Sequence, residues 1–313
     1  MRVLVLGGTG FIGSAVVKAL IGRGHAVARF HRGFAADGME TIRGDRRELG
    51  RHRKAFAQFG PDVVVDTIAY TELDAAQFVE TFRGLARRAV VLSSQDVYAA
   101  YGRLLRLESR ARELGPLGED AALRAERYPY RAKARNPGDM AHDYDKILVE
   151  AAVVGHADLP ATILRLPFVY GPGDPQRRLR PYLDQMRGPE ILLDRAKASW
   201  RWTRGYVEDV AEAIALAAGH ARAAGRIYNV GEQDAVTEAE WVRLIGEAAN
   251  WRGEVRGIPA VELPDGLVEP FDFSQDLAID TRRIRKELGF HEPVGRKEGL
   301  RRTVAWEAAQ PRE

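Results

Sequence analysis

The chain has 313 residues, enough for one large α/β domain or two modest ones, and 45% of them are hydrophobic, as in packed globular proteins. It contains no cysteine, which excludes disulfide bonds, thiolate metal sites and cysteine nucleophiles. The formal net charge is only +3 and the basic excess is scattered, so composition favours phosphate-bearing small molecules over nucleic acid as partners. The first apolar run is too short for a signal or membrane segment, so we expect a cytoplasmic protein.

The first thirty residues predict a strand, a glycine turn and a helix, in that order. Residues 2–6 (RVLVL) are aliphatic and β-branched, which is typical of a buried parallel strand. Apolar positions then recur at helical spacing from Ile12 to Leu20 and stop at the glycines of residues 22–24. Glycine permits the tight turn and lets the backbone approach a pyrophosphate, while the helix N-terminus offers free N–H groups. We therefore predict a dinucleotide site whose cofactor-binding residues include Gly7, Gly10, Phe11, Ile12 and Gly13.

The end of the second strand, residues 26–30, bears on which dinucleotide is bound. An NAD site usually has Asp or Glu here to hold the ribose 2′-hydroxyl, whereas a nearby Arg accommodates a 2′-phosphate. This strand ends instead in His31 and Arg32. The predicted cofactor is therefore NADP, with NAD possible, bound through both side chains.

Motifs spread over nearly the whole chain resemble those of the extended short-chain dehydrogenase/reductases, the NAD(P)-dependent nucleotide-sugar epimerase and dehydratase group. In chain order they are GGTGFIG (7–13), Gly44-Asp45, VVVDTIA (63–69), VLSSQDVY (91–98), LRLPFVYGP (164–172), GYVEDV (205–210), IYNVG (227–231) and DTRRIRKELGF (280–290), the last resembling the family's closing helix. Their number and order favour the family more than any single motif does. The resemblance implies that Asp45 contacts the adenine amine, that Ala69 lies near the nicotinamide ribose and that Ser94 is the catalytic serine.

The pattern of elements predicts the same architecture. Apolar strands alternate with amphipathic helices through Leu166, which indicates an α/β fold with a doubly wound parallel Rossmann sheet. We expect residues 1–170 to form the NAD(P)-binding domain and 171–313 a smaller α/β substrate-binding lobe, with 205–231 returning to the first domain. A capping box at residues 237–240 predicts a helix in that lobe.

The stretch AHDYDKILVE, residues 141–150, is where the chain departs from the family. The resemblance implies a Tyr and a Lys four residues apart on one helix, but Tyr144 precedes Lys146 by only two. On a regular helix that spacing turns the side chains about 200° apart, so the two cannot act together. A second Tyr–Lys pair, Tyr130 and Lys133, lies in an Arg-rich insertion (102–139), but the Asn-Pro-Gly of residues 136–138 would break its helix.

We therefore predict that Lys146 holds the nicotinamide ribose and that His142, four residues before it, takes the place of the phenol. Histidine exchanges protons near neutral pH, because its ordinary pKa is about 6.5. Alternatively, His142 is a polar residue at a helix start and redox chemistry is impaired. Tyr144 stays a catalytic candidate that faces elsewhere in the pocket, and Tyr130 can still fold back over the site.

The substrate side is less defined by the sequence. Arg177 and Arg178 follow the sixth strand, where the diphosphate of a nucleotide-linked substrate could sit. Arg204 ends the WRWTR segment (200–204) before GYVEDV, which could stack on and clamp a base or sugar or could pack the two lobes together. The histidines lack metal-ligand spacing, so we expect no metal site. A homodimer is compatible with the resemblance.

Two classes of function remain. The first is an NAD(P)-dependent oxidoreductase, epimerase or dehydratase, acting by hydride transfer at a secondary alcohol or carbonyl of a sugar or nucleotide-sugar-like molecule. The second is a dinucleotide-binding regulator or RNA-associated relative without turnover, which the altered Tyr position favours. The predicted substrate lobe and Ser94 favour the enzyme, because a sensor needs neither.

Overall fold

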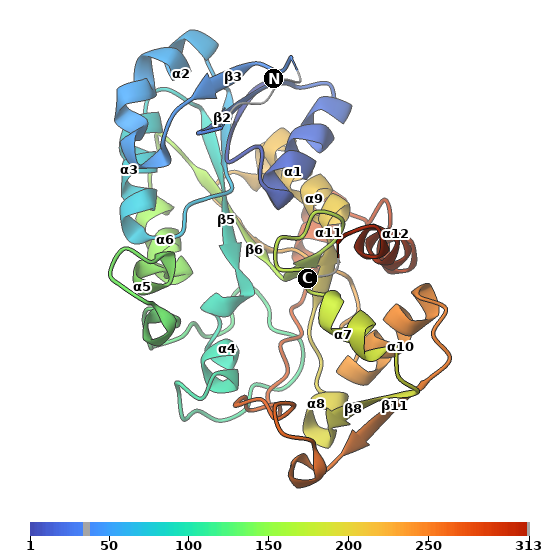
Figure 1. The fold of residues 1–313 in the computed structure, drawn as a ribbon. Helices are drawn as coiled ribbons and strands as arrows, with labels where there is room; N and C mark the ends of the chain where they lie inside the picture. The colour runs from blue at the N-terminus through green and yellow to red at the C-terminus, as the bar shows by residue number, and fades with distance from the viewer. Residues whose placement is uncertain (34–37, 312–313) are drawn as a thin grey trace.

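The computed structural model describes residues 1–33 and 38–311. Across this part of the chain, a seven-stranded sheet with every neighbour pair parallel forms the centre of the fold (Figure 1). In spatial order its strands are β10 (Ile227–Asn229), β6 (Ala161–Leu166), β5 (Arg88–Ser94), β4 (Val63–Asp66), β1 (Arg2–Leu6), β2 (Ala26–His31) and β3 (Thr41–Arg43). The predicted doubly wound α/β fold is confirmed.

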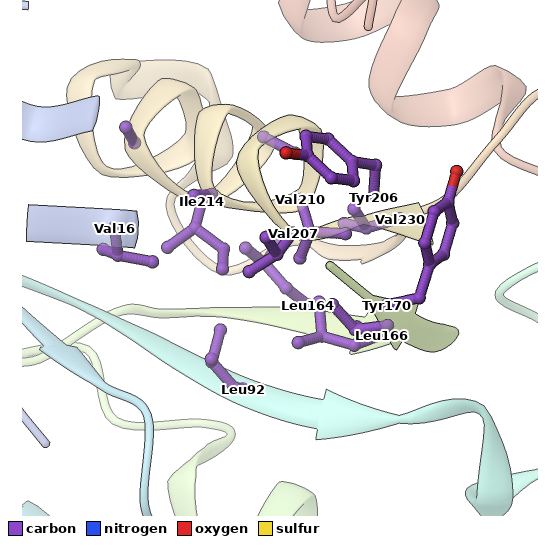
Figure 2. Packing of buried hydrophobic residues seen from close by; sticks show 14 of the residues in the cluster. Val16, Leu92, Leu164, Leu166, Tyr170, Tyr206, Val207, Val210, Ile214 and Val230 are labelled. Atoms are coloured by element: carbon purple, nitrogen blue, oxygen red, sulfur yellow. The ribbon is translucent and has the colours of Figure 1, made fainter. Parts of the chain in front are cut away.

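Helices cover both faces of this sheet, as Figure 1 shows. One face carries α1 (Phe11–Gly22) and α9 (Val207–Gly219), and the other carries α2 (Arg53–Phe59), α3 (Glu72–Phe82) and α6 (Lys146–Val153). Because side chains alternate along a strand, Val3 and Val5 pack into one core, whereas Leu4 and Leu6 pack into the other. Figure 2 shows the first core, where α9 presents its apolar side to the strands.

The C-terminal part of the chain adds a smaller lobe beside the carboxyl ends of the strands. It contains two further parallel pairs, β7 (Phe168–Tyr170) with β9 (Arg204–Tyr206) and β8 (Glu190–Asp194) with β11 (Glu254–Ile258). Its helices are α7 (Arg180–Gln185), α8 (Arg195–Ser199), α10 (Glu238–Ala248) and α12 (Arg296–Ala308), whereas α11 (Arg282–Leu288) packs beside β10 at the edge of the central sheet. The predicted capping box is present at α10, where Thr237 and Glu240 satisfy each other's backbone N–H groups. The DTRRIRKELGF segment forms α11 but does not close the fold, because α12 follows it.

Short helices and single turns complete the description. They are α4 (Ala99–Leu104), α5 (Met140–Asp143) and the 3₁₀ turns η1 (Arg46–His52), η2 (Gln95–Val97), η3 (Arg131–Lys133), η4 (Ala221–Ala223) and η5 (Ala260–Glu262). The pair Tyr130–Lys133 thus lies at a single 3₁₀ turn, as expected from the helix-breaking residues that follow it.

The AHDYDKILVE stretch is not one helix, and this prediction was wrong. Helix α5 ends at Asp143, Tyr144 and Asp145 are extended, and α6 begins at Lys146. The break is stabilised by Asp145, whose carboxylate caps α6 by accepting a 2.9 Å hydrogen bond from the N–H of Ile147. His142 and Lys146 therefore do not share a helix face.

Candidate active site

A cleft of about 630 Å³ opens at the glycine turn, where the carboxyl ends of β1, β2 and β4 meet. In a doubly wound sheet this edge is where a dinucleotide binds. Of the predicted cofactor residues, those that line the cleft are Gly7, Gly10, His31, Arg32 and Asp45. Phe11, Ile12 and Gly13 follow directly, as the first turn of α1.

The glycine turn has the close backbone packing that a pyrophosphate cradle needs. Gly7 has a φ of +85°, a conformation that side chains disfavour. A Cβ on Gly13 would lie 2.1 Å from the carbonyl oxygen of Gly7, so glycine alone fits there. At Gly10 the nearest atom to such a Cβ is 3.7 Å away, so packing within the fold does not require glycine there. The cradle fits a dinucleotide.

The far end of the cleft combines cations with one acid. Arg32 is exposed there, whereas His31 is buried. The Asp45 carboxylate binds the backbone N–H (2.9 Å) and guanidinium (2.8 Å) of Arg47, which lowers the pKa of Asp45 to about 2. Asp45 is therefore ionised and held in place at the rim, and its contact with adenine stays a prediction.

A buried arginine that the sequence reasoning missed lies against the same cleft. Arg46 forms ion pairs with Asp66 at the end of β4 (2.7 Å) and with Asp74 of α3 (3.1 Å). Its position directly after Gly44-Asp45 gave no local signal, because both partners lie at least 20 residues away. The pairs connect the segment after β3 to the central sheet.

Lys146 lies between the carboxyl ends of two central strands. Its ammonium group is buried and donates hydrogen bonds to the carbonyl oxygens of Ala69 (2.6 Å) and Leu92 (2.8 Å). Burial lowers the pKa of Lys146 to about 8. The structure thus brings together two residues predicted to lie near the nicotinamide ribose, Lys146 and Ala69.

Tyr144, not His142, lies beside Lys146. The Tyr144 hydroxyl donates a 2.8 Å hydrogen bond to Oδ2 of Asp96, and its ring centre lies 6.0 Å from the Lys146 ammonium. The prediction that Tyr144 points away was wrong, because the extended backbone at this residue lets its side chain reach the lysine. His142 instead lies on α5, where its Nδ1 and Oδ1 of the exposed Asp143 are 2.7 Å apart.

Ser94 ends β5 next to this group, and its hydroxyl accepts a 3.2 Å hydrogen bond from the backbone N–H of Asp96. Burial and the neighbouring Asp96 hold the pKa of Tyr144 well above its ordinary value, an effect that Ser94 partly offsets. The phenol is therefore protonated in the resting protein. Ser94, Tyr144 and Lys146 form one cluster at the edge of the sheet.

Asp96 and Tyr130 complete the cluster. Asp96 belongs to the VLSSQDVY motif, but no role for it was predicted. It is 3% exposed, and burial raises its pKa. Tyr130 does fold back over the site, since its hydroxyl donates to Oδ2 of Asp96 at 3.2 Å. Asp96 had a signal in the sequence, because it is an acidic residue two positions after Ser94. Tyr130 had none, because the sequence does not show where the insertion runs.

The three predicted substrate arginines all form internal ion pairs. Arg177 binds Glu307 of α12 (2.7 Å), and Arg178 binds Asp174 (2.6 Å). Arg204 is 2% exposed, pairs with Glu238 and lies over the Trp241 ring, so it belongs to the core of the lobe. Arg177 and Arg178 stay partly exposed, so a ligand could still reach them.

Comparison with known proteins gives this architecture a family. The family model for the NAD dependent epimerase/dehydratase family matches residues 3–231. The chain belongs to this family. The expectation of an NAD(P)-dependent enzyme of the short-chain dehydrogenase type, acting as an oxidoreductase or epimerase/dehydratase, is thereby confirmed.

Relatives and solved structures match over nearly the full length. The dTDP-glucose 4,6-dehydratase of Streptomyces griseus is 30% identical, over 97% of this chain and 93% of its own. The UDP-N-acetyl-alpha-D-glucosaminuronate decarboxylase of Bacillus cytotoxicus is 24% identical, over 97% of both. The structure of Thermus thermophilus UDP-glucose 4-epimerase in complex with NAD superposes with a TM-score of 0.69 at 25% identity, covering 99% of this chain and 100% of that one.

Among residues 1–33 and 38–311, no helix has the length and apolar character needed to span a membrane. Over the same ranges, no group of three or more His, Asp or Glu side chains is placed to hold a metal ion.

Proposed function

We propose that this enzyme transfers hydride between NADP(H) and a secondary alcohol or carbonyl on a sugar-like small molecule, with Ser94, Tyr144 and Lys146 as its catalytic residues. The observation that carries the proposal is the placement of the Tyr144 hydroxyl beside Ser94, Asp96 and Lys146 at the carboxyl edge of the sheet. Tyr144 thus supplies a phenol beside Lys146. The lack of a Tyr four residues before Lys146 had favoured a protein without turnover.

Each side chain has a distinct task in this scheme. The hydroxyl of Ser94 orients the substrate oxygen by a hydrogen bond, and the phenol of Tyr144 exchanges a proton with that oxygen. Lys146, anchored by the carbonyls of Ala69 and Leu92, holds the ribose next to the nicotinamide, and its charge favours negative charge that develops on the phenol. When bound, the nicotinamide accepts or donates the hydride.

The preference for NADP over NAD rests on Arg32. This exposed guanidinium lines the cleft next to His31, where a 2′-phosphate would lie. Asp45, the acidic residue at the same rim of the cleft, is already bound by the guanidinium of Arg47. A charge-assisted pair with a phosphate contributes about 1.5–3 kcal/mol, or roughly ten- to a hundredfold in affinity.

A sugar-like substrate fits the surroundings of Ser94. Leu166 of β6 pairs with Ser94, so Phe168 follows just beyond the catalytic edge, where its ring packs edge-on against Trp202 at 4.6 Å. Aromatic faces suit the C–H surface of a sugar. Arg178, 5.1 Å above the Phe168 ring, is the better placed of the predicted arginines for a diphosphate, which would compete with Asp174 for it.

The test is incubation of the full-length protein with NADP⁺ or NAD⁺ and a panel of UDP-glucose, dTDP-glucose and free sugars. Absorbance of the reduced nicotinamide and product analysis by NMR follow the reaction. The proposal predicts cofactor reduction or an altered sugar with at least one of them, faster with NADP⁺. Tight NADP(H) binding without turnover across a broad panel of sugars, aldehydes and ketones would instead support the non-catalytic regulator.

A further inference from the structure

Four side chains from three parts of the chain form a continuous line of hydrogen bonds behind the proposed catalytic phenol. Tyr144 donates to Oδ2 of Asp96 at 2.8 Å, and Tyr130 donates to the same oxygen at 3.2 Å. The hydroxyls of Tyr130 and Tyr101 are 2.8 Å apart, and either can be the donor. The line runs from the catalytic cluster through Tyr130 of the insertion to Tyr101 of α4.

We propose that Asp96 takes the proton that Tyr144 gives up, and that Tyr130 and Tyr101 pass it on towards the surface. This inference rests on the proposed function, since it assigns the route of the proton that accompanies hydride transfer. Asp96 and Tyr130 act through Tyr144, so both are positioning residues.

The chemistry requires such a partner for the phenol. Because the pKa of Tyr144 is raised well above its ordinary value, a free phenolate is not available as a base near neutral pH. In alcohol oxidation the carbinol C–H bond breaks with hydride passing to NADP⁺. The hydroxyl proton of the substrate moves to the Tyr144 oxygen while the phenolic proton of Tyr144 moves to Asp96. A hydrogen-bonded carboxylate makes this exchange possible without phenolate accumulation.

The surroundings of Asp96 suit it to holding a proton for a short time. Burial raises its pKa, whereas the nearby cations Arg124 and Lys146 and the Tyr144 hydroxyl oppose that rise. Its Oδ1 is buried and has no hydrogen-bond partner within the described part of the chain. An unpaired buried oxygen disfavours the ionised form, so both protonation states are accessible.

Tyr130, which links Asp96 to Tyr101, belongs to the insertion, and the insertion is fastened at two places. Arg124 of the insertion is fully buried and binds both the carbonyl oxygen of Asp96 (2.7 Å) and the carboxylate of Asp145 (3.3 Å). The N–H of Tyr128 donates to Asp145 at 2.7 Å. These contacts fix Tyr130 over Asp96, and Tyr130 and Tyr101 are both partly exposed, so the line ends at residues that solvent reaches.

The decisive experiment is an infrared titration of the carboxyl stretch of Asp96 in the full-length protein without cofactor or substrate, assigned with Asp96→Asn. The midpoint is expected above the ordinary value of about 4. Tyr130→Phe removes a donor to the carboxylate and should raise the midpoint by about one pH unit. Tyr128→Phe, a change of the same kind in the same loop, should leave it unchanged. An unchanged midpoint in Tyr130→Phe would overturn the proposal.

A turnover measurement separates a proton route from a structural role. Tyr130→Phe should lower kcat of alcohol oxidation about tenfold with little change in KM, and move the acid limb of the pH profile upward with the infrared midpoint. Tyr101→Phe, which does not touch Asp96, should lower kcat and increase the solvent isotope effect while leaving the midpoint in place. Equal losses of Tm and activity in both variants, with unshifted pH profiles, would show that the tyrosines only pack. Because the infrared titration needs no turnover, it stands even if the proposed reaction is wrong.

Discussion

The ammonium group of Lys146 lies 6.0 Å from the centre of the Tyr144 ring, although Lys146 follows Tyr144 by two positions in the chain and not by four. A continuous helix would place these side chains on opposite sides. They meet because the backbone is extended at Tyr144 and Asp145, and this break is imposed by contacts of Asp145 with Arg124, Tyr128 and Ile147.

Asp145→Ala should therefore destabilise the protein strongly. The carboxylate and Arg124 are both fully buried, and removing one partner of such a pair typically costs about 3–5 kcal/mol. Asp143→Ala, two residues earlier and 57% exposed at its side chain, should change the unfolding free energy by less than about 0.5 kcal/mol. Urea unfolding of both variants measures the difference, and similar losses would show that the buried pair is not what holds the break.

The sequence sufficed for features whose cause is local. Residues 3–6 and 63–65 are continuous apolar runs, so their burial in a parallel sheet could be predicted, and Thr237 with Glu240 predicted the start of α10. The break before α6 also had a local signal, because Asp145 precedes an apolar run as an N-cap does.

The rest of the site depends on distant partners. Tyr130 reaches Asp96 across 34 residues, and Arg124 reaches Asp145 across 21, so no periodicity in either segment could reveal these contacts. The predicted placement of His142 on one helix face with Lys146 was wrong for the same reason, since it assumed a regular helix where tertiary hydrogen bonds impose an extended backbone.

Gly10→Val should abolish cofactor binding while the protein stays folded. The site of the added Cβ has no atom closer than 3.7 Å, so the fold accommodates it, but the side chain lines the cleft. Gly13→Ala, whose Cβ would lie 2.1 Å from the Gly7 carbonyl, should instead lower Tm. Calorimetric titration with NADP(H) tests the first, and unchanged affinity in folded Gly10→Val would place the cofactor elsewhere.

Arg32→Asp should reverse the cofactor preference. The variant removes the cation offered to a 2′-phosphate and adds an acid able to accept a hydrogen bond from the 2′-hydroxyl of NAD. The ratio of Kd values for NADPH and NADH, from fluorescence titration, should change by roughly a hundredfold. Arg195→Asp, the same charge change at an exposed position of α8, is the control. Equal affinity of the parent protein for both cofactors would contradict the assignment.

Lys146→Met should weaken NADP(H) binding by about tenfold or more and alter the pH dependence of stability. The pKa of Lys146 is about 8 in the folded protein against 10.5 ordinarily, so between these values the unfolded chain binds more protons. Stability contributed by this group therefore rises as pH rises through that window. The unfolding free energy of wild type minus variant should increase between about pH 8 and about pH 10.5. A difference independent of pH would show that burial does not perturb this lysine.

The most direct measurement of the account is kcat for Tyr144→Phe beside His142→Phe, with NADP⁺ and whichever sugar supports turnover. The structure places the Tyr144 hydroxyl in the cluster with Asp96 and Lys146, and His142 outside it. Loss of an acid–base group lowers the rate by about 10²- to 10⁴-fold. The kcat of Tyr144→Phe should therefore be lower than that of wild type by this factor, with nearly unchanged cofactor affinity. His142→Phe should stay within about twofold of wild type, since it is no part of the acid–base cluster. The opposite result, an active Tyr144→Phe and an inactive His142→Phe, would contradict the central claim.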